Sequence, residues 1–442
     1  MRTLWFTALV SAICLEGLGR RYLPQVPSIA FYLLKDFVLL IGFLRYRTPP
    51  HSWRVVLHLY RGFQLAWLGG FVWTLIELAN PDQASVPLGV LGVRAYWLWW
   101  FAPPIIANVL RQAEHKRKAI YVLLTMAIGI SALASYQFAS PADSAANLYS
   151  VVDGEEVYAS GSAIVASTGR ARVASTFSFV SGFANFVVLI PTLLLSIGLE
   201  VKDRKLRRLA LMATLATAAV VPMAGSRGAV VLGLGVLLIT VWSAGLFFTR
   251  IGRRVVVGAI VSGVLALFAF PDAFAGVQSR FEQTEETMGR FKEAAIILPP
   301  VALAVLDYPI AGIGTGMQQN ARGSLRVYTP WVAESEVGRL LVELGPMGYL
   351  LIWTAKLGLA VALWRAYRIL KRAGKRGSAG AALGYAALAL ISNLTFDHVY
   401  QALFFMGCGL ILSEVVTVVH PNDPAAQRAR VAGEPAPAAS TL

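Results

Sequence analysis

Charge-free apolar runs of roughly 18–25 residues recur along the chain and constrain its fold more than any other feature. A helix of this length crosses the ~30 Å hydrocarbon layer of a membrane. Soluble domains carry about 25% charged residues, whereas this chain of 442 residues has 14% and is 57% hydrophobic. The sequence therefore predicts an all-α polytopic membrane protein and argues against a soluble enzyme.

We expect about twelve membrane-spanning helices. The predicted spans are 3–18, 27–44, 63–80, 88–110, 118–138, 175–199, 206–223, 228–248, 254–270, 337–363, 379–396 and 399–418. The first run continues into LEGLGRRYLP without a small-residue cleavage site, which favours a retained helix over a signal peptide. Residues 1–420 are thus expected to form one integral membrane domain, and the polar tail 421–442 is expected to be disordered and cytoplasmic.

Lys and Arg are concentrated in every second connection between these spans. Cytoplasmic loops are enriched in both residue types, so the sequence predicts a multi-pass protein of the bacterial inner membrane with both termini cytoplasmic. These short loops meet anionic lipid headgroups. Membrane lipids, and not nucleic acid, are therefore the partners that the net charge of +15 indicates.

Two long segments, 139–174 and 271–336, are predicted to face outward. Ordered loops longer than about 12–15 residues are usually functional, and the second segment is the better candidate for a site. The chain has no GxxxxGK[ST] phosphate loop, no HExxH and no cluster of His or Cys. Cys14 and Cys408 both lie in apolar runs, so neither a disulfide framework nor a thiolate metal site is expected, and no cofactor is predicted.

Arginines at the outward side are the first candidate binding residues. Arg227 lies in a short turn between Gly225 and Gly228, where a helix N-terminus follows and favours an anion such as phosphate. The alternative is that Arg227 only snorkels to the interface. Arg172 lies just before the predicted span 175–199, on the same outward side. Arg290 lies in the long outward segment 271–336. The guanidinium fork of each suits phosphate and diphosphate.

Carboxylates at the start of the span 337–363 are the candidate catalytic groups. Glu334 and Glu336 precede Arg339 and Glu343, and Glu336, Arg339 and Glu343 share one helical face. A carboxylate beside the arginines would deprotonate a sugar hydroxyl. Alternatively, Glu336 only pairs with Arg339 one turn along. The GIGTG run at 312–316 follows a proline and no strand, so we interpret it as a turn and not as a nucleotide site.

The order of several short motifs resembles the O-antigen ligase and O-antigen polymerase superfamily of bacterial inner-membrane glycosyltransferases, over most of the chain. The motifs are EGLGRRYLP followed by KDFVLL, RVASTF at 172–177, SRG at 226–228, GR at 289–290 with PIAGIG downstream, and ELGPMG at 343–348.

This resemblance implies a helical glycosyltransferase of the C superfamily type. Its donor would be a glycan linked to a polyprenyl (undecaprenyl) diphosphate, transferred without metal or nucleotide sugar to an acceptor glycan. Arg172, Arg227, Arg290 and Arg339 would bind the donor. A flippase and a chain-length regulator would be its partners in polysaccharide biosynthesis.

The sequence departs from the ligase pattern at one point. Ligases of the superfamily have a His-Asn pair just upstream of the ELG segment, where this chain has Glu334-Ser335-Glu336. A polymerase therefore fits better than a ligase that transfers glycan to the lipid A core. A lipid-linked-glycan flippase or transporter is the alternative from another class, and it would place charged or broken helices near the middle of the membrane.

Overall fold

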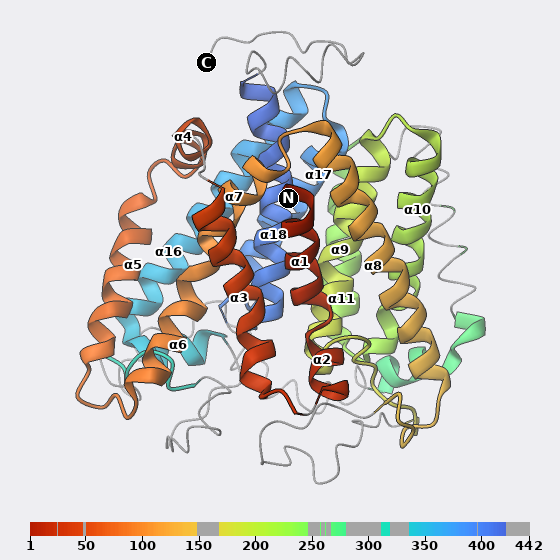
Figure 1. The fold of residues 1–442 in the computed structure, drawn as a ribbon, viewed down its shortest axis with the longest axis horizontal. Helices are drawn as coiled ribbons and strands as arrows, with labels where there is room; N and C mark the ends of the chain where they lie inside the picture. Colours follow the sequence, from red (N-terminus) through yellow and green to blue (C-terminus); the bar gives the residue numbers. More distant parts are fainter. Residues whose placement is uncertain are drawn as a thin grey trace.

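The computed structural model describes residues 1–23, 25–46, 50–147, 168–245, 257, 261, 267–279, 311–318, 336–395 and 397–420. Within these ranges the chain is helical and contains no strand, so the predicted all-α class is confirmed. The helices run side by side in a bundle (Figure 1). Their bounds are α1 (Arg2–Cys14), α2 (Glu16–Tyr22), α3 (Ser28–Arg45), α4 (Pro50–Leu59), α5 (Gln64–Ile76), η1 (Glu77–Ala79), α6 (Val86–Trp97), η2 (Leu98–Phe101), α7 (Ala102–Val109), α8 (Ala113–Ala139), α9 (Val180–Glu200), α10 (Arg204–Ala219), η3 (Val221–Ala224), α11 (Arg227–Ser243), α16 (Glu336–Arg372), α17 (Arg376–Ile391) and α18 (His398–Val419).

Four of the described helices, α8, α9, α16 and α18, are long and apolar enough to cross a membrane. A fifth span results if the pair Ser52–Leu59 and Gln64–Ala79, bent by 96°, is counted as one. The prediction of about twelve spans is therefore wrong for the described residues. The predicted span 254–270 lies mostly outside them.

The missing spans have a physical cause in breaks of the backbone. The run 3–18 ends as a helix at Cys14, and α2 starts anew at Glu16. The run 88–110 divides into α6, η2 and α7, because Pro103 and Pro104 lack the amide donors that a continuous helix needs. α10 and α17 have 16 residues each, and α11 has 17.

Small residues bring the helices close together in the core. α9 packs against α10, α11, α17 and α18. On α17, a Cβ added at Gly380 would lie 2.7 Å from the carbonyl oxygen of Thr240 in α11, and one at Gly384 would lie 2.8 Å from a methyl group of Val236. Such residues allow close backbone approach, which stabilises helix packing in membranes through van der Waals contact.

The basic connections share one end of the bundle. Lys116 at the start of α8 and Lys375 before α17 both form ion pairs with Glu414 near the end of α18, the latter at 3.4 Å. Arg117 pairs with Asp203, the N-cap of α10, at 3.2 Å. We call this the basic end; α1 begins here and α2 lies at the opposite end (Figure 1).

A glycine breaks α16 sharply. Gly345 has φ 64° and ψ −179°, and Pro346 follows it. The turn is held by Trp73, whose indole donates to the Leu344 carbonyl at 2.9 Å. An L side chain rarely adopts this φ, so the break depends on glycine and separates residues 336–344 from the long part of the helix.

Gly345→Ala is expected to lower the free energy of unfolding by about 1–2 kcal/mol, because alanine is strained at positive φ. Thermal unfolding of the purified protein measures the change. The matched control is Gly129→Ala in α8, where a Cβ meets nothing within 4 Å and φ is ordinary; this variant should be neutral or slightly more stable. Equal behaviour of both variants would mean that the break imposes no conformational demand.

Candidate functional site

Charged side chains are buried between α2, α3, α6, α16 and α18, toward the end opposite the basic end. Their members are Glu16, Arg20, Lys35, Asp36, Arg94, Glu336, Arg339, Glu343 and Lys356. We call this set, with Tyr32 and His398, the polar cluster. Burying a charge is costly unless it is paired, and ionisable residues inside membrane helices usually mark a functional site.

One half of the polar cluster surrounds the ring of Tyr32. The carboxylate of Glu16 accepts from Arg20 at 2.5 Å and from Lys35 at 2.6 Å. The Lys35 ammonium lies 4.9 Å from the centre of the Tyr32 ring, and the Arg94 guanidinium lies 4.4 Å from it. Arg20 lies 5.9 Å from the same ring centre, so cations from three helices, α2, α3 and α6, surround Tyr32.

Asp36 binds this half to α6 and η2. Nε of Arg94 donates to Asp36 Oδ2 at 2.6 Å, and the Trp99 indole donates to Oδ1 at 3.0 Å. Nη1 of Arg94 is buried and has no hydrogen-bond acceptor among the described residues. A buried donor without an acceptor is costly, so an anionic ligand at this point would be stabilised.

His398, the first residue of α18, packs edge-on against Tyr32 with the ring centres 5.1 Å apart. Asp397 fixes this helix start, since its side chain accepts from the amides of Val399 and Tyr400 at 2.8 and 2.9 Å. The cations that act on the partly buried imidazole are Lys35, Arg94 and Arg339.

The other half is centred on Glu343, which is fully buried. Its Oε1 accepts from Arg339 Nε at 3.1 Å and from the Gln318 amide at 2.7 Å. Its Oε2 accepts from the Tyr96 hydroxyl at 2.6 Å and from the Gly316 amide at 2.9 Å. Four donors thus hold one carboxylate, which makes Glu343 a structural centre.

The GIGTG run forms a tight turn against α16 and α6. Gly312, Gly314 and Gly316 have φ values of 77°, 101° and 83°, as the interpretation as a turn required. The Ile313 amide donates to the Val342 carbonyl at 2.8 Å. A Cβ at Gly312 would lie 2.6 Å from the carbonyl carbon of Glu343, so glycine is needed for the close approach as well as for φ.

Glu336, also in the polar cluster, is 4% exposed. Its contacts are separate from those around Tyr32 and those around Glu343. Its Oε1 accepts from the amide and the hydroxyl of Thr395 at 2.6 and 2.7 Å. Its Oε2 pairs with Lys356, which also donates to the Ser392 carbonyl at 3.0 Å. The alternative pairing of Glu336 with Arg339 is therefore wrong. The break at Gly345 brings Lys356 to Glu336. Arg339 pairs instead with Glu343, one helical turn along.

Arg172 and the SRG turn lie together. Nε of Arg172 donates to the Ala224 carbonyl at 3.4 Å, and a Cβ at Gly225 would lie 3.1 Å from this side chain. Gly225 has φ 58°, and Ser226 caps α11 by accepting from the Ala229 amide at 3.3 Å. Arg227 is therefore the first residue of a helix whose N-terminus favours anions.

The segment after Arg172 attaches this site to α2. The Thr176 hydroxyl donates to the Cys14 carbonyl at 2.5 Å, and the Leu18 amide donates to the Thr176 carbonyl at 3.1 Å. Arg21 donates to the Phe177 carbonyl at 3.1 Å. The RVASTF and EGLGRR motifs, which are far apart in sequence, are thus joined by hydrogen bonds.

Arg290 and Glu334 lie outside the described residues. Among the residues that are described, no group of three or more His, Cys, Asp or Glu side chains has an arrangement suited to a metal ion. No protein-family model matches the chain, and no curated protein matches it.

Proposed function

We propose that the protein is a membrane glycosyltransferase that polymerises or transfers an oligosaccharide linked to a polyprenyl diphosphate. The observation that carries this proposal is the polar cluster, which collects arginines, a lysine and carboxylates at the end opposite the basic connections. The guanidinium fork of an arginine suits a diphosphate, and carboxylates suit proton transfer from an acceptor hydroxyl.

The proposal includes a topology. Basic connections favour the cytoplasm, so the basic end is assigned to the cytoplasmic side and the polar cluster to the periplasmic side of a bacterial inner membrane.

The donor diphosphate is assigned to Arg172 and Arg227 at the N-terminus of α11, with Arg290 and Arg339 as further binding residues. In the reaction, an acceptor hydroxyl oxygen bonds to the anomeric carbon of the donor and the bond from that carbon to the diphosphate oxygen breaks. The arginines stabilise the departing charge, an effect worth about 3–4 kcal/mol for a well-placed donor.

Glu336 is assigned the role of base. A carboxylate has about four lone-pair sites, and the described donors, two from Thr395 and one from Lys356, occupy three. The fourth is available to an acceptor hydroxyl. Glu334 is the alternative base, and the imidazole of His398, beside Tyr32 in the polar cluster, is a third group with the required chemistry.

The proposal is tested by measuring glycan transfer by the purified protein, with a synthetic polyprenyl-diphosphate oligosaccharide as donor. A ladder of products supports a polymerase, and a single addition to a core-oligosaccharide acceptor supports a ligase. A flippase is the second candidate, because Lys35, Asp36 and Lys356 are buried within helices and α16 is broken, as in transporters. Movement of the donor across the liposome membrane without any glycan transfer would favour the flippase and overturn the proposal that the protein is an enzyme.

Arg227→Lys is expected to lower turnover at least about tenfold although charge is kept, because an ammonium cannot form the paired hydrogen bonds of a guanidinium. Transfer rate and donor affinity are measured together. Arg208→Lys, on an exposed position of α10 near the basic end, is the matched control and should behave as wild type. Wild-type turnover in Arg227→Lys and Arg227→Ala would leave Arg227 without a role in donor binding.

A further inference from the structure

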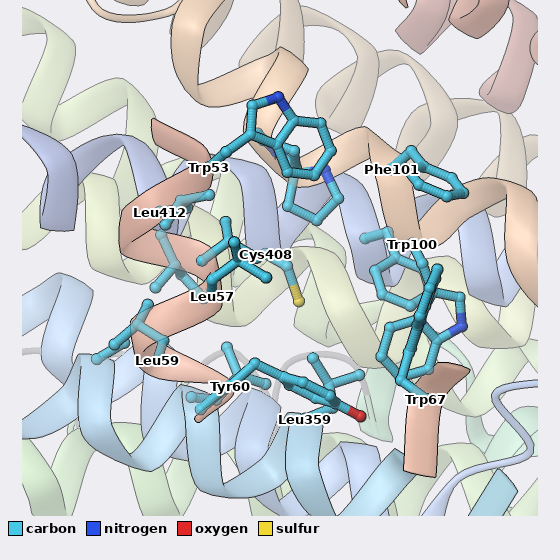
Figure 2. A pocket seen from close by; sticks show the side chains of 18 of the residues that line it. Trp53, Leu57, Leu59, Tyr60, Trp67, Trp100, Phe101, Leu359, Cys408 and Leu412 are labelled. Carbon is cyan, nitrogen blue, oxygen red and sulfur yellow. The ribbon is translucent and has the colours of Figure 1, made fainter. Parts of the chain in front are cut away.

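A second feature, whose lining shares no residue with the polar cluster, is an apolar cavity of about 270 Å³ between α4, α5, η2, α7, α16 and α18. Figure 2 shows Trp67, Trp100 and Phe101 along one side of it and Leu57 and Leu412 along the other. An apolar cavity does not hold water well, so hydrocarbon is the matching occupant.

The few polar groups in the lining already have partners. The Tyr60 hydroxyl donates to the Ala355 carbonyl at 2.6 Å. The Gln64 amide donates to the Leu57 carbonyl at 2.9 Å, and its oxygen accepts from the Gly62 amide at 3.2 Å. The side chains of Tyr60 and Gln64 therefore offer little hydrogen bonding to a sugar or a diphosphate.

The helix that covers the cavity has a basic outer side. α4 bends away from α5 by 96°, turns Trp53 and Leu57 to the cavity and exposes Arg54 and His58, with Arg61 just beyond its end. Arg365, seven residues before the end of α16, donates to the carbonyls of Leu59 and Arg61 at 2.7 and 2.8 Å and fixes this arrangement near the basic end. A helix with one apolar and one basic side is typical of the membrane surface.

We propose that this cavity binds an acyl chain of an anionic phospholipid, whose headgroup lies against Arg54 and Arg61. The charge of these arginines complements the headgroup, and the aromatic lining encloses the hydrocarbon. The site is independent of the proposed transferase reaction, because it lies near the basic end and shares no residue with the polar cluster.

The test compares thermal unfolding of the full chain in phosphatidylcholine nanodiscs with and without added phosphatidylglycerol. Wild type should gain about 4 °C with phosphatidylglycerol. Ala366→Leu fills the cavity and should lose most of this gain, as should Arg54→Ala with Arg61→Ala. Ala362→Val is the milder filling variant if Ala366→Leu does not fold. Ala360→Leu, on the same helix but outside the cavity, is the matched control and should keep the gain.

The proposal is overturned by any of three results. In the first, both filling variants keep the full gain, so that the lipid acts elsewhere. In the second, wild type gains nothing from phosphatidylglycerol over phosphatidylcholine, so that the headgroup is not recognised. In the third, only added polyprenyl phosphate stabilises wild type, and the filling variants abolish that effect, so that the cavity belongs to the substrate's tail.

Discussion

Glu336→Gln is expected to lower turnover by about 10²–10⁴-fold while donor binding persists. The amide keeps the size of the side chain, yet it cannot take the proton of an acceptor hydroxyl. The arginines assigned to the donor are untouched, so affinity for the polyprenyl diphosphate should stay near wild type. Single-turnover transfer and equilibrium donor binding, measured on the same preparation, separate these two quantities.

The ion pair with Lys356 requires a control, because Glu336→Gln leaves a buried ammonium without its partner. The double variant Glu336→Gln with Lys356→Met removes that charge as well and should recover thermal stability without recovering turnover. Recovered turnover would show that Glu336 acts only by neutralising Lys356. His398→Gln is measured alongside; a loss confined to this variant, with Glu336→Gln fully active, would move the base to the other half of the polar cluster.

Glu343→Gln is expected to lower the free energy of unfolding by about 3–5 kcal/mol, because it removes the carboxylate charge that pairs with the buried Arg339. Both carboxylate oxygens accept hydrogen bonds, so either orientation of the new amide directs its NH₂ at donors from Arg339 and Gln318 or from Tyr96 and Gly316. Chemical unfolding followed by tryptophan fluorescence measures the loss.

The matched control for Glu343 is Glu114→Gln in α8. Glu114 pairs with Lys118 at 2.6 Å on the exposed side of its helix, where screening leaves little net stabilisation. The free energy of unfolding of this variant should equal that of wild type. If the two variants were equally stable, the four hydrogen bonds to Glu343 would contribute nothing beyond a neutral contact.

The sequence predicts the helical class because the long apolar runs can be recognised directly in it. It overestimates the number of spans, since hydropathy does not register where a backbone breaks, as at Leu15. The Gly345-Pro346 pair is a visible signal of a break, although the run 337–363 reads as one span.

Part of the candidate site is visible in the sequence. Arg172 and the SRG turn, both predicted from the sequence to be on the outward side, lie next to each other. Lys35, Asp36 and Lys356 stand out as charges inside apolar runs, which signals function, but their partners are not visible. The pair of Tyr96 and Glu343, 247 residues apart, and the pairing of Glu336 with Lys356 depend on packing that no local pattern encodes.

The glycine turn at 311–318 has a consequence for the order in which the protein is built. Its Gly316 and Gln318 amides are satisfied by a carboxylate made 27 and 25 residues later in the chain. During synthesis the turn therefore emerges before its acceptor exists, and its amides must stay hydrated until the first turns of α16 arrive. The turn and the start of α16 thus mature together, late in biogenesis, after α1 to α11 have been synthesised. A ribosome stalled before residue 343 would hold a chain in which α1 to α11 are made and the half of the polar cluster around Glu343 is not.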